Sequence, residues 1–269
     1  MEKECIDYLL HLADDSLILG HRNSEWCGHG PVLEQDIAIT NIALDLIGQA
    51  RNFYQYAAQL INGSQNAGSS KTPSILDGGF GGEASEDSLA YLRDRHEFKN
   101  CLLTEQPNDD WAKTILRQFL FSSYQYFLYE ELQGSSTPQI AAIAEKSLKE
   151  VTYHLRWSSE WVIRLGDGTK ESHQKMISAI EELWKYTGEL FEATGYELQA
   201  ASENMGVDPS SLKTKWEQKV KNVFREATLP YPDKVSMKTG GKQGDHSEYL
   251  SHILADLQFM QRAYPNSEW

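Results

Sequence analysis

The stretch PVLEQDIAITNIALDLIGQARNFYQYAAQLI, residues 31–61, says most about the fold of this chain. Apolar residues recur in it every three or four positions, which is the period of an α-helix. They fall on two stripes, one with Leu33, Ile37, Leu44 and Ile47 and one with Ile39, Ile42, Leu46, Ala50 and Phe53. A helix that is apolar nearly all round is normally a central one. We therefore expect a long central helix from about Pro31 to Ile61.

Helical spacing continues on both sides of this stretch, while alternating strand patterns are scarce. Helix starts are marked by Asn108, by Thr137-Pro138 and by Asp208-Pro209, which supply capping oxygens and a proline for the first turn. Long helices joined by tight breaks predict an all-α fold with a ferritin-like four-helix bundle core and accessory helices. The further helices are expected at about Ile6–His21, Glu86–Thr104, Asp109–Gln133, Pro138–Gly166, Glu171–Tyr196, Pro209–Ala227 and Ser247–Ala263.

Residues 62–85 interrupt this pattern with the sequence NGSQNAGSSKTPSILDGGFGGEAS. The stretch is rich in Gly, Ser and Asn, a composition typical of flexible connections. We expect a mobile loop there and a single helical domain over residues 1–269.

The composition narrows the class of partner. With 25 Lys and Arg against 39 Asp and Glu, the 269-residue chain carries a net charge of −14, which repels nucleic acids and anionic membranes. The three cysteines, Cys5, Cys27 and Cys101, are odd in number and widely spaced, which favours a reducing compartment. Because the first residues are acidic and no long apolar run follows, we expect a cytoplasmic protein.

A four-helix bundle raises the question of a dinuclear iron site, which takes one Glu from each of two helices and a Glu-x-x-His pair from each of the others. Residues three apart share a helix face, so the carboxylate can bridge two metals while the imidazole binds one. None of the eight histidines has an acid three positions earlier. The residues found there are Tyr8, Ile18, Trp26, Arg93, Val151, Lys170, Gln243 and Tyr249. We therefore expect no catalytic residue, metal site or cofactor in this chain.

Acidic residues at other spacings leave weaker interpretations open. The pairs Asp7/His11, Glu150/His154 and Glu248/His252 are four residues apart and also share helix faces, most simply as surface charge pairs. Glu150/His154 is the most interesting of them, because it lies in the middle of a long helix. A solvated helix surface is the simplest interpretation of Glu181, Glu182, Glu189, Glu192 and Glu197.

Four segments resemble the family of non-catalytic, ferritin-like structural subunits of bacterial phenylacetyl-CoA 1,2-epoxidases. The segments are EWCGHGPVLEQDIAITNIALDLIGQARNF (25–53), RDRHEFKNCLLTEQPNDDWAKTILRQF (93–119), KEVTYHLRWSSEWVIRLGDGT (149–169) and MKTGGKQGDHSEYLSHILADLQFMQR (237–262). The resemblance covers the chain from about Asp14 onward, and the 62–85 loop departs from it by being longer and richer in Gly and Ser.

The resemblance implies that a separate catalytic subunit carries a di-iron centre and inserts one oxygen atom of O₂ into the aromatic ring. This chain would then be a scaffold partner, also expected to form dimers or larger assemblies when alone. Where the catalytic relative has metal ligands, this chain has the vestigial positions Leu46, Gln49, Val151 and His154. The rival hypotheses are an active di-iron oxygenase with an atypical ligand set and a helical interaction protein unrelated to oxygen chemistry.

The segment from Lys234 to Gly244 concentrates positive charge and glycine in an otherwise acidic chain. It looks like a phosphate loop only superficially, because no Ser or Thr follows its lysine and no strand precedes it. It is expected to be a solvated connector, or else to contact the partner or the anionic CoA tail of the substrate. The candidate contact residues are Lys234, Lys238, Gly240, Gly241 and Lys242.

Overall fold

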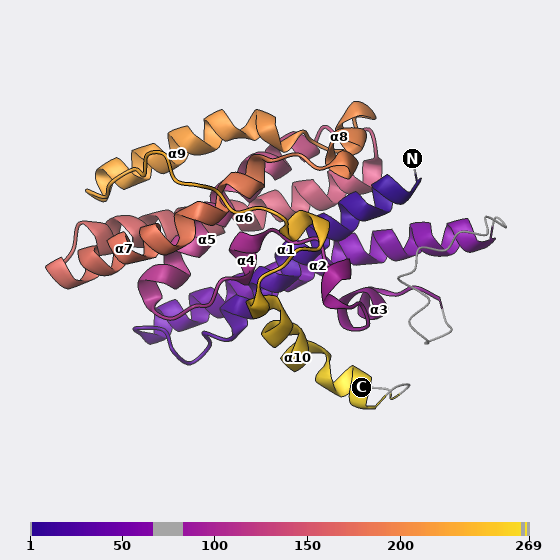
Figure 1. Cartoon of the computed structure of the whole chain (residues 1–269), viewed down its shortest axis with the longest axis horizontal. Helices are drawn as coiled ribbons and strands as arrows, with labels where there is room; N and C mark the ends of the chain where they lie inside the picture. Colours follow the sequence, from indigo (N-terminus) through magenta and orange to yellow (C-terminus); the bar gives the residue numbers. More distant parts are fainter. Residues whose placement is uncertain (1, 67–82, 265–266, 268–269) are drawn as a thin grey trace.

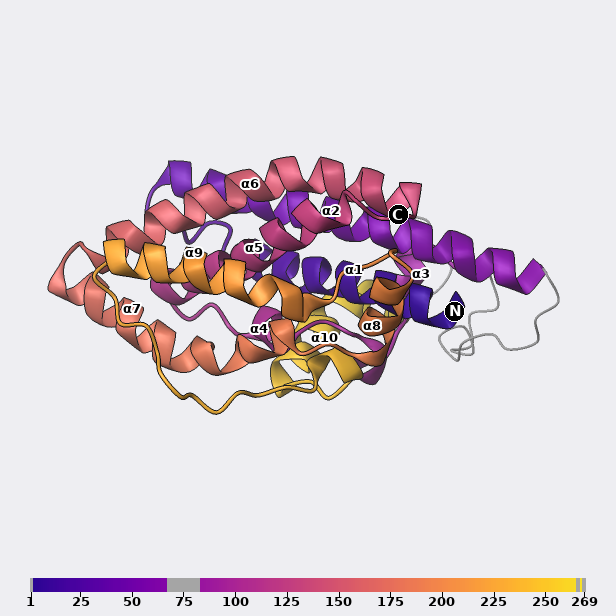
Figure 2. The same cartoon turned by 90° about the horizontal axis from the view of Figure 1, so that it is seen from above.

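Four long helices form the core of the computed structural model, which describes residues 2–66, 83–264 and 267. They are α1 (Glu2–Ser24), α2 (Leu33–Asn66), α5 (Trp111–Leu132) and α6 (Pro138–Gly166). α1 packs on α2, α5 packs on α6, and α2 also contacts α6 (Figures 1 and 2). The described residues contain no β-strand, so the predicted all-α class is confirmed.

Shorter helices cover this core. α7 and α9 lie on α5 and α6, α8 lies on α1, and α10 lies against α3 and α1 (Figure 1). Within the described ranges, no helix is both long and apolar enough to cross a membrane. The bounds are α3 (Glu86–Tyr91), α4 (Leu102–Glu105), α7 (Lys170–Leu183), α8 (Gly195–Ser202), α9 (Lys213–Glu226) and α10 (Glu248–Ala263).

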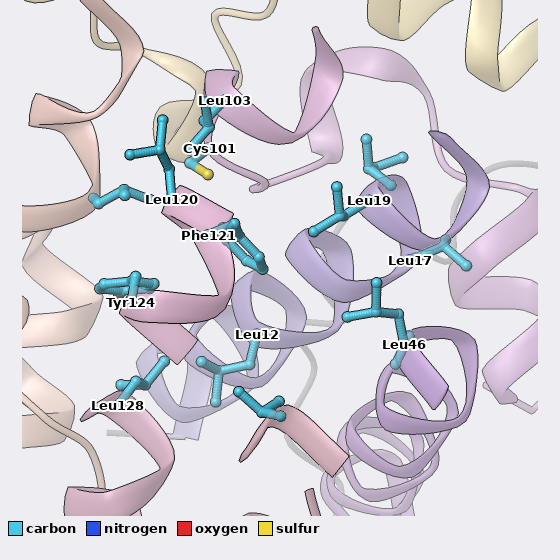
Figure 3. Packing of buried hydrophobic residues seen from close by; sticks show 14 of the residues in the cluster. Leu12, Leu17, Leu19, Leu46, Cys101, Leu103, Leu120, Phe121, Tyr124 and Leu128 are labelled. Atoms are coloured by element: carbon cyan, nitrogen blue, oxygen red, sulfur yellow. The ribbon is translucent and has the colours of Figure 1, made fainter. Parts of the chain in front are cut away.

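Leucine and aromatic side chains from three of the long helices fill the space between them. Figure 3 shows buried side chains of these helices, among them Leu12 of α1, Leu46 of α2 and Phe121, Tyr124 and Leu128 of α5. All five are at most 4% exposed. Since each buried side chain of this size contributes about 1.5–3 kcal/mol, the core is the main source of stability.

The outer side of α2 departs from the expectation of a helix buried all round. Ile39, Ile42, Leu46, Ala50 and Phe53 are buried as predicted. On the other stripe, Leu33, Ile37 and Leu44 are 71%, 51% and 62% exposed, and this part of the prediction is wrong. The reason is positional: α1 and α6 cover one side of α2 only.

The predicted helix Glu86–Thr104 is also wrong, because the chain there breaks into α3, a 3₁₀ turn at Arg95–Glu97 and α4. Two carboxylates of α1 explain the break. Asp14 accepts a hydrogen bond from the Lys99 backbone N–H at 2.7 Å, and Asp15 accepts one from Cys101 N–H at 2.7 Å. These amides are therefore paired across the fold rather than within a helix.

The predicted helix Glu171–Tyr196 is also wrong, because the chain leaves the α-helix early. α7 stops at Leu183, 3₁₀ turns follow at Trp184–Tyr186 and Gly188–Phe191, and Thr194 caps α8. Glu189 is 2% exposed, and its carboxylate accepts a hydrogen bond from Leu102 N–H at 2.6 Å. The interpretation of Glu189 and Glu197 as solvated surface residues is wrong, since both are buried.

The predicted loop at 62–85 overlaps the end of α2, because residues 62–66 are helical. Asn62 exchanges two hydrogen bonds with the backbone of Ala84, at 2.9 and 2.8 Å, and so joins the two sides of the segment. The mobile loop predicted between them, over 67–82, lies outside the described residues.

Asp14 gives the first testable prediction, because its fully buried carboxylate pairs with Arg93 and also accepts from Tyr54. Replacing one partner of a buried ion pair leaves the other charge unpaired, so Asp14→Asn is expected to lower the free energy of unfolding by about 3–5 kcal/mol. Denaturant titration measures this loss. Glu171→Gln, which breaks an exposed pair with Lys175, is the matched control and is expected to leave the midpoint unchanged. Equal midpoints for the two variants would contradict the prediction.

Candidate functional site

The four positions predicted from the resemblance lie together at the contact of α2 and α6. Leu46 and Gln49 come from α2, and Val151 and His154 come from α6. All four side chains are at most 1% exposed. The four positions are thus buried between these helices, while their descent from metal-binding positions stays a prediction.

A chain of hydrogen bonds crosses the bundle at this level. Gln49 donates to Glu150 Oε2 at 2.9 Å and accepts from the Tyr129 hydroxyl at 3.3 Å. Gln125, one turn before Tyr129 on α5, donates to that hydroxyl at 3.5 Å and to Ser16 Oγ at 3.3 Å. Each of the four long helices thus contributes a polar side chain to one connected network.

His154 has a different partner from the one expected. Its Nε2 lies 2.9 Å from Asp45 Oδ2 on α2, so this nitrogen carries the proton that the carboxylate accepts. Glu150, the acid four residues earlier, instead binds Gln49. The predicted pairing of Glu150 with His154 is therefore replaced by two contacts between α2 and α6.

In the other two acid–histidine pairs, the acid and the histidine also do not bind each other. Asp7 lies 3.4 Å from Lys99 Nζ, while His11 is fully buried and its Nδ1–H donates to the Lys99 carbonyl at 2.8 Å. Glu248 and His252 are both exposed on α10. None of the three pairs is a joint site.

The donor set at the bundle centre does not fit a di-iron centre. Such a centre needs carboxylates that bridge two metals, and Leu46 and Val151 offer no donor atom. Gln49 is neutral, and Glu150 and His154 each hold another side chain. Over the residues whose positions are described, no cluster of three or more His, Cys, Asp or Glu side chains has the arrangement to hold a metal ion. We therefore assign no metal chemistry to these residues.

The segment between Lys234 and Gly244 is mostly exposed, but one of its lysines is not. Lys234 and Lys238 face solvent, whereas Lys242 is only 2% exposed. Lys242 Nζ lies 3.0 Å from Glu197 Oε1. The prediction that Lys242 is free to contact a partner or CoA is wrong, because a buried carboxylate already neutralises it.

The glycines of this segment serve close packing. A Cβ on Gly241 would lie 2.6 Å from the carbonyl oxygen of Asn100, and Gly244 has φ +91° and lies against His96. The carboxylate of Glu189 accepts from the backbone N–H of Gly240 at 2.8 Å. The predicted candidates Gly240 and Gly241 thus fasten the segment to the body of the protein and are not an open phosphate loop.

Lys242 lies in a buried cluster of charged side chains. The sequence pattern did not predict this cluster. His11 Nε2 lies 3.4 Å from Glu197 Oε1, and His11 Nδ1 lies 3.7 Å from Asp15 Oδ2. Burial alone would raise the pKa of Glu197, but Lys242 and His11 beside it lower that pKa to about 2. Burial alone would lower the pKa of His11, but Asp15 and Glu197 raise it. Opposite charges therefore hold each other in the interior.

A second buried cluster joins α4 to the start of α10. Glu105 Oε1 lies 2.6 Å from His246 Nδ1, and its other oxygen accepts from Ser247 N–H at 2.9 Å. The only sequence signal for this contact is Ser247, at the N-cap position of α10. The carboxylate that binds there lies more than a hundred residues earlier, out of reach of local patterns.

Two comparisons with known proteins agree with each other. The family model described as phenylacetic acid catabolic protein matches residues 1–269. One of the subunits of the 1,2-phenylacetyl-CoA epoxidase of Escherichia coli strain K12 is 44% identical over 262 residues, which cover 97% of this chain and 98% of the relative.

The buried pair of Lys242 and Glu197 yields a prediction for stability against pH. A group whose pKa falls on folding adds stability above its unfolded value, 4.5 here, and loses it as the pH falls toward 2. Lys242→Met is expected to cost about 3–5 kcal/mol at pH 7 because it removes the nearest positive charge from a buried carboxylate. The difference from the unsubstituted chain should shrink as the pH falls from 4.5 toward 2.

Unfolding titrations at several pH values measure this difference. Lys238→Met removes an exposed lysine from the same segment and is the matched control. If both variants have the same unfolding free energy at pH 7, the buried pair has no stabilising role.

Proposed function

The chain belongs to the family of phenylacetic acid catabolic proteins, and we propose on that basis that it is a non-catalytic structural subunit of a phenylacetyl-CoA 1,2-epoxidase complex. The complex would act in aerobic phenylacetate degradation. The similarity to the E. coli epoxidase subunit extends over nearly the whole length of both chains and supports this role. A scaffold of this kind needs a rigid fold and a surface for its partner.

The hydrogen-bonded bundle centre is the observation that carries the non-catalytic part of the proposal. Gln49 and Tyr129 connect α2, α5 and α6 there by contacts that need no metal. An oxygen-activating di-iron site at the same place would need Glu150 and His154 to leave Gln49 and Asp45. An atypical di-iron oxygenase is therefore the less favoured function.

The proposed partner is a catalytic subunit that carries the di-iron centre and inserts one oxygen atom into the aromatic ring of phenylacetyl-CoA. In this arrangement the present chain binds no iron. It orients and stabilises the catalytic subunit, and its own residues do not touch the reacting atoms. A dimer of the scaffold would bring two catalytic subunits into one assembly.

The lysines that remain exposed in the 234–244 segment are the proposed contacts to that partner or to the CoA tail. Lys234 and Lys238 are both free to approach an anionic group, and the backbone of the segment is fixed by the Lys238 N–H, which donates to the Lys185 carbonyl at 2.7 Å. Anchored lysines bind phosphate as point charges. Lys242 takes no part in this contact.

Reconstitution with the cognate catalytic subunit tests the proposed function. The mixture is expected to elute from size-exclusion chromatography as one complex, and epoxidation of phenylacetyl-CoA is expected only when both subunits and a reductant are present. Separate elution of the two proteins would contradict the scaffold role. Turnover by this chain alone would contradict the non-catalytic assignment.

Charge reversal of the two exposed lysines tests the contact segment. Lys234→Glu combined with Lys238→Glu is expected to weaken complex formation, or to raise the apparent KM for phenylacetyl-CoA, by roughly tenfold, with the larger effect at low salt. Lys175→Glu, on helix α7 and outside the segment, is the control. If the double reversal changes neither quantity, the segment is only a connector.

A further inference from the structure

Two buried histidines bind neighbouring carbonyl groups of one short segment, residues 98–105, which leads into α4 and includes it. His11 of α1 is fully buried, and its Nδ1–H donates to the Lys99 carbonyl at 2.8 Å. His246, just before α10, is 5% exposed, and its Nε2 lies 2.8 Å from the Phe98 carbonyl oxygen. The segment is thus held by imidazole rings from both ends of the chain.

Both ring nitrogens of His246 face oxygen atoms that accept. A carbonyl oxygen cannot donate, so Nε2 carries a proton. Nδ1 lies 2.6 Å from Glu105 Oε1. The same carboxylate accepts from Asn100 Nδ2 at 3.0 Å and from the backbone N–H and the hydroxyl of Ser247. A carboxylate surrounded by donors is held in its ionised form, so the proton between it and Nδ1 belongs to the histidine. The ring of His246 is therefore a cation.

The geometry around His11 leads to the same charge state. Its Nε2 lies 3.4 Å from Glu197 Oε1 and has no hydrogen bond to any described residue. In a neutral ring this nitrogen would turn its lone pair toward the carboxylate, and the two would repel each other. A proton on Nε2 converts the repulsion into attraction. Burial lowers the pKa of His11 and Lys242 opposes its charge, but Asp15 and Glu197 outweigh both and raise that pKa.

The other titratable groups around His11 are neutral or already paired. Asp14, which accepts from the Lys99 N–H, is paired with Arg93, and the Lys99 ammonium lies 3.4 Å from Asp7. Burial raises the pKa of three further groups, which keep their protons: Tyr124 on α5, Tyr196 on α8 and Cys101. The balance around His11 is therefore set by Asp15, Glu197 and Lys242.

The charged groups near His246 do not replace its proton either. Arg22 donates to the backbone carbonyl of Glu105, and Arg95 donates to that of His246 at 2.7 Å. Neither guanidinium binds the Glu105 carboxylate through these contacts. Burial raises the pKa of Tyr186, on the turn after α7, so this phenol is neutral. His246 thus supplies the positive charge that lies against Glu105.

We propose that the two histidinium rings form a pH-sensitive clamp on residues 98–105, which opens when the rings lose their protons. The direction follows from linkage. A histidine whose pKa is raised on folding gives its full stabilisation below its ordinary value of 6.5, and this stabilisation is lost as the pH rises through the folded value. The clamp is therefore closed in mildly acidic solution and opens on the alkaline side.

Opening would also loosen the segment that carries the exposed lysines. Glu189 accepts from Leu102 N–H at 2.6 Å and from Gly240 N–H at 2.8 Å, so residues 98–105 and the 234–244 segment share one anchor. The backbone from which Lys238 projects would lose part of its support. This consequence rests on the proposed contact between that lysine and the partner, whereas the clamp itself concerns the isolated chain.

Nitrogen NMR of the unsubstituted chain, labelled with ¹⁵N at histidine, tests the charge states. At pH 6.5 the rings of His11 and His246 are expected to be protonated on both nitrogens. The exposed His252 is the titrating reference in the same spectrum. A neutral ring at either buried position at this pH would overturn the clamp, and this measurement needs no variant that must fold.

Hydrogen exchange follows the opening. Between pH 6.5 and about pH 8.5, with the intrinsic rates corrected, the protection of the Leu102 and Ser247 amides is expected to fall at least roughly tenfold. The amides in the middle of α6 are expected to keep their protection. A loss of equal size in α6 would show general unfolding and contradict a local clamp.

Asp15→Asn links the opening to His11. This change keeps an oxygen that can accept from Cys101 N–H but removes the charge that most strongly raises the pKa of His11. The loss of protection is expected to begin at lower pH in this variant. His252→Gln, which changes an exposed histidine on α10, is the control and is expected to match the unsubstituted chain. An unchanged profile for a folded Asp15→Asn would overturn the role of His11.

Binding of the catalytic subunit at the two pH values separates this inference from the proposed function. The complex is expected to be weaker at the higher pH. If residues 98–105 open and the complex is equally tight, the contact role of the lysine segment fails while the clamp stands. If the amides of residues 98–105 keep their protection, the clamp is wrong whatever the complex does.

Discussion

A polar group in the middle of the four-helix core needs a partner there, since an unpaired buried group costs about 1–3 kcal/mol. In this chain most partners come from the protein itself, and Gln125 Oε1 and His154 Nδ1 are among the few buried atoms of the described residues that lack one. Gln49 lies between Glu150 and Tyr129, and the network reaches Ser16 on α1 through Gln125. The side chains that connect the four helices are therefore committed to each other, which is why this bundle suits a structural role.

The same requirement shapes the irregular parts of the fold. Asp14 and Asp15 project from α1 into the segment around residues 93–102, and Glu189 binds both that segment and the backbone of Gly240. Buried carboxylates thus accept hydrogen bonds from backbone N–H groups in the irregular segments of the chain. They also join the body of the protein to the segment that leads into α10, so the exposed lysines there project from an anchored backbone.

Local sequence patterns predicted the bounds of helices that are set by residues close together in the sequence. α6 has the predicted bounds because Pro138 opens it and Gly166, packed against Ala227, ends it. The break after Tyr91 could not be predicted, because the Lys99 and Cys101 amides meet Asp14 and Asp15 only in the folded chain. Periodicity also could not distinguish the covered side of α2 from the open one. For the site, the family resemblance led to the bundle centre, but the contact of His154 with Asp45 arises from helix packing.

The central claim is that hydrogen bonds, not metal ions, hold the centre of this bundle. Anomalous diffraction at the iron absorption edge, from crystals of this chain in complex with the proposed catalytic subunit, tests it directly. The account predicts anomalous peaks in the catalytic subunit only, with Gln49 still bound to Glu150 and Tyr129. A peak between α2 and α6 within coordination distance of Glu150 and His154 would contradict it.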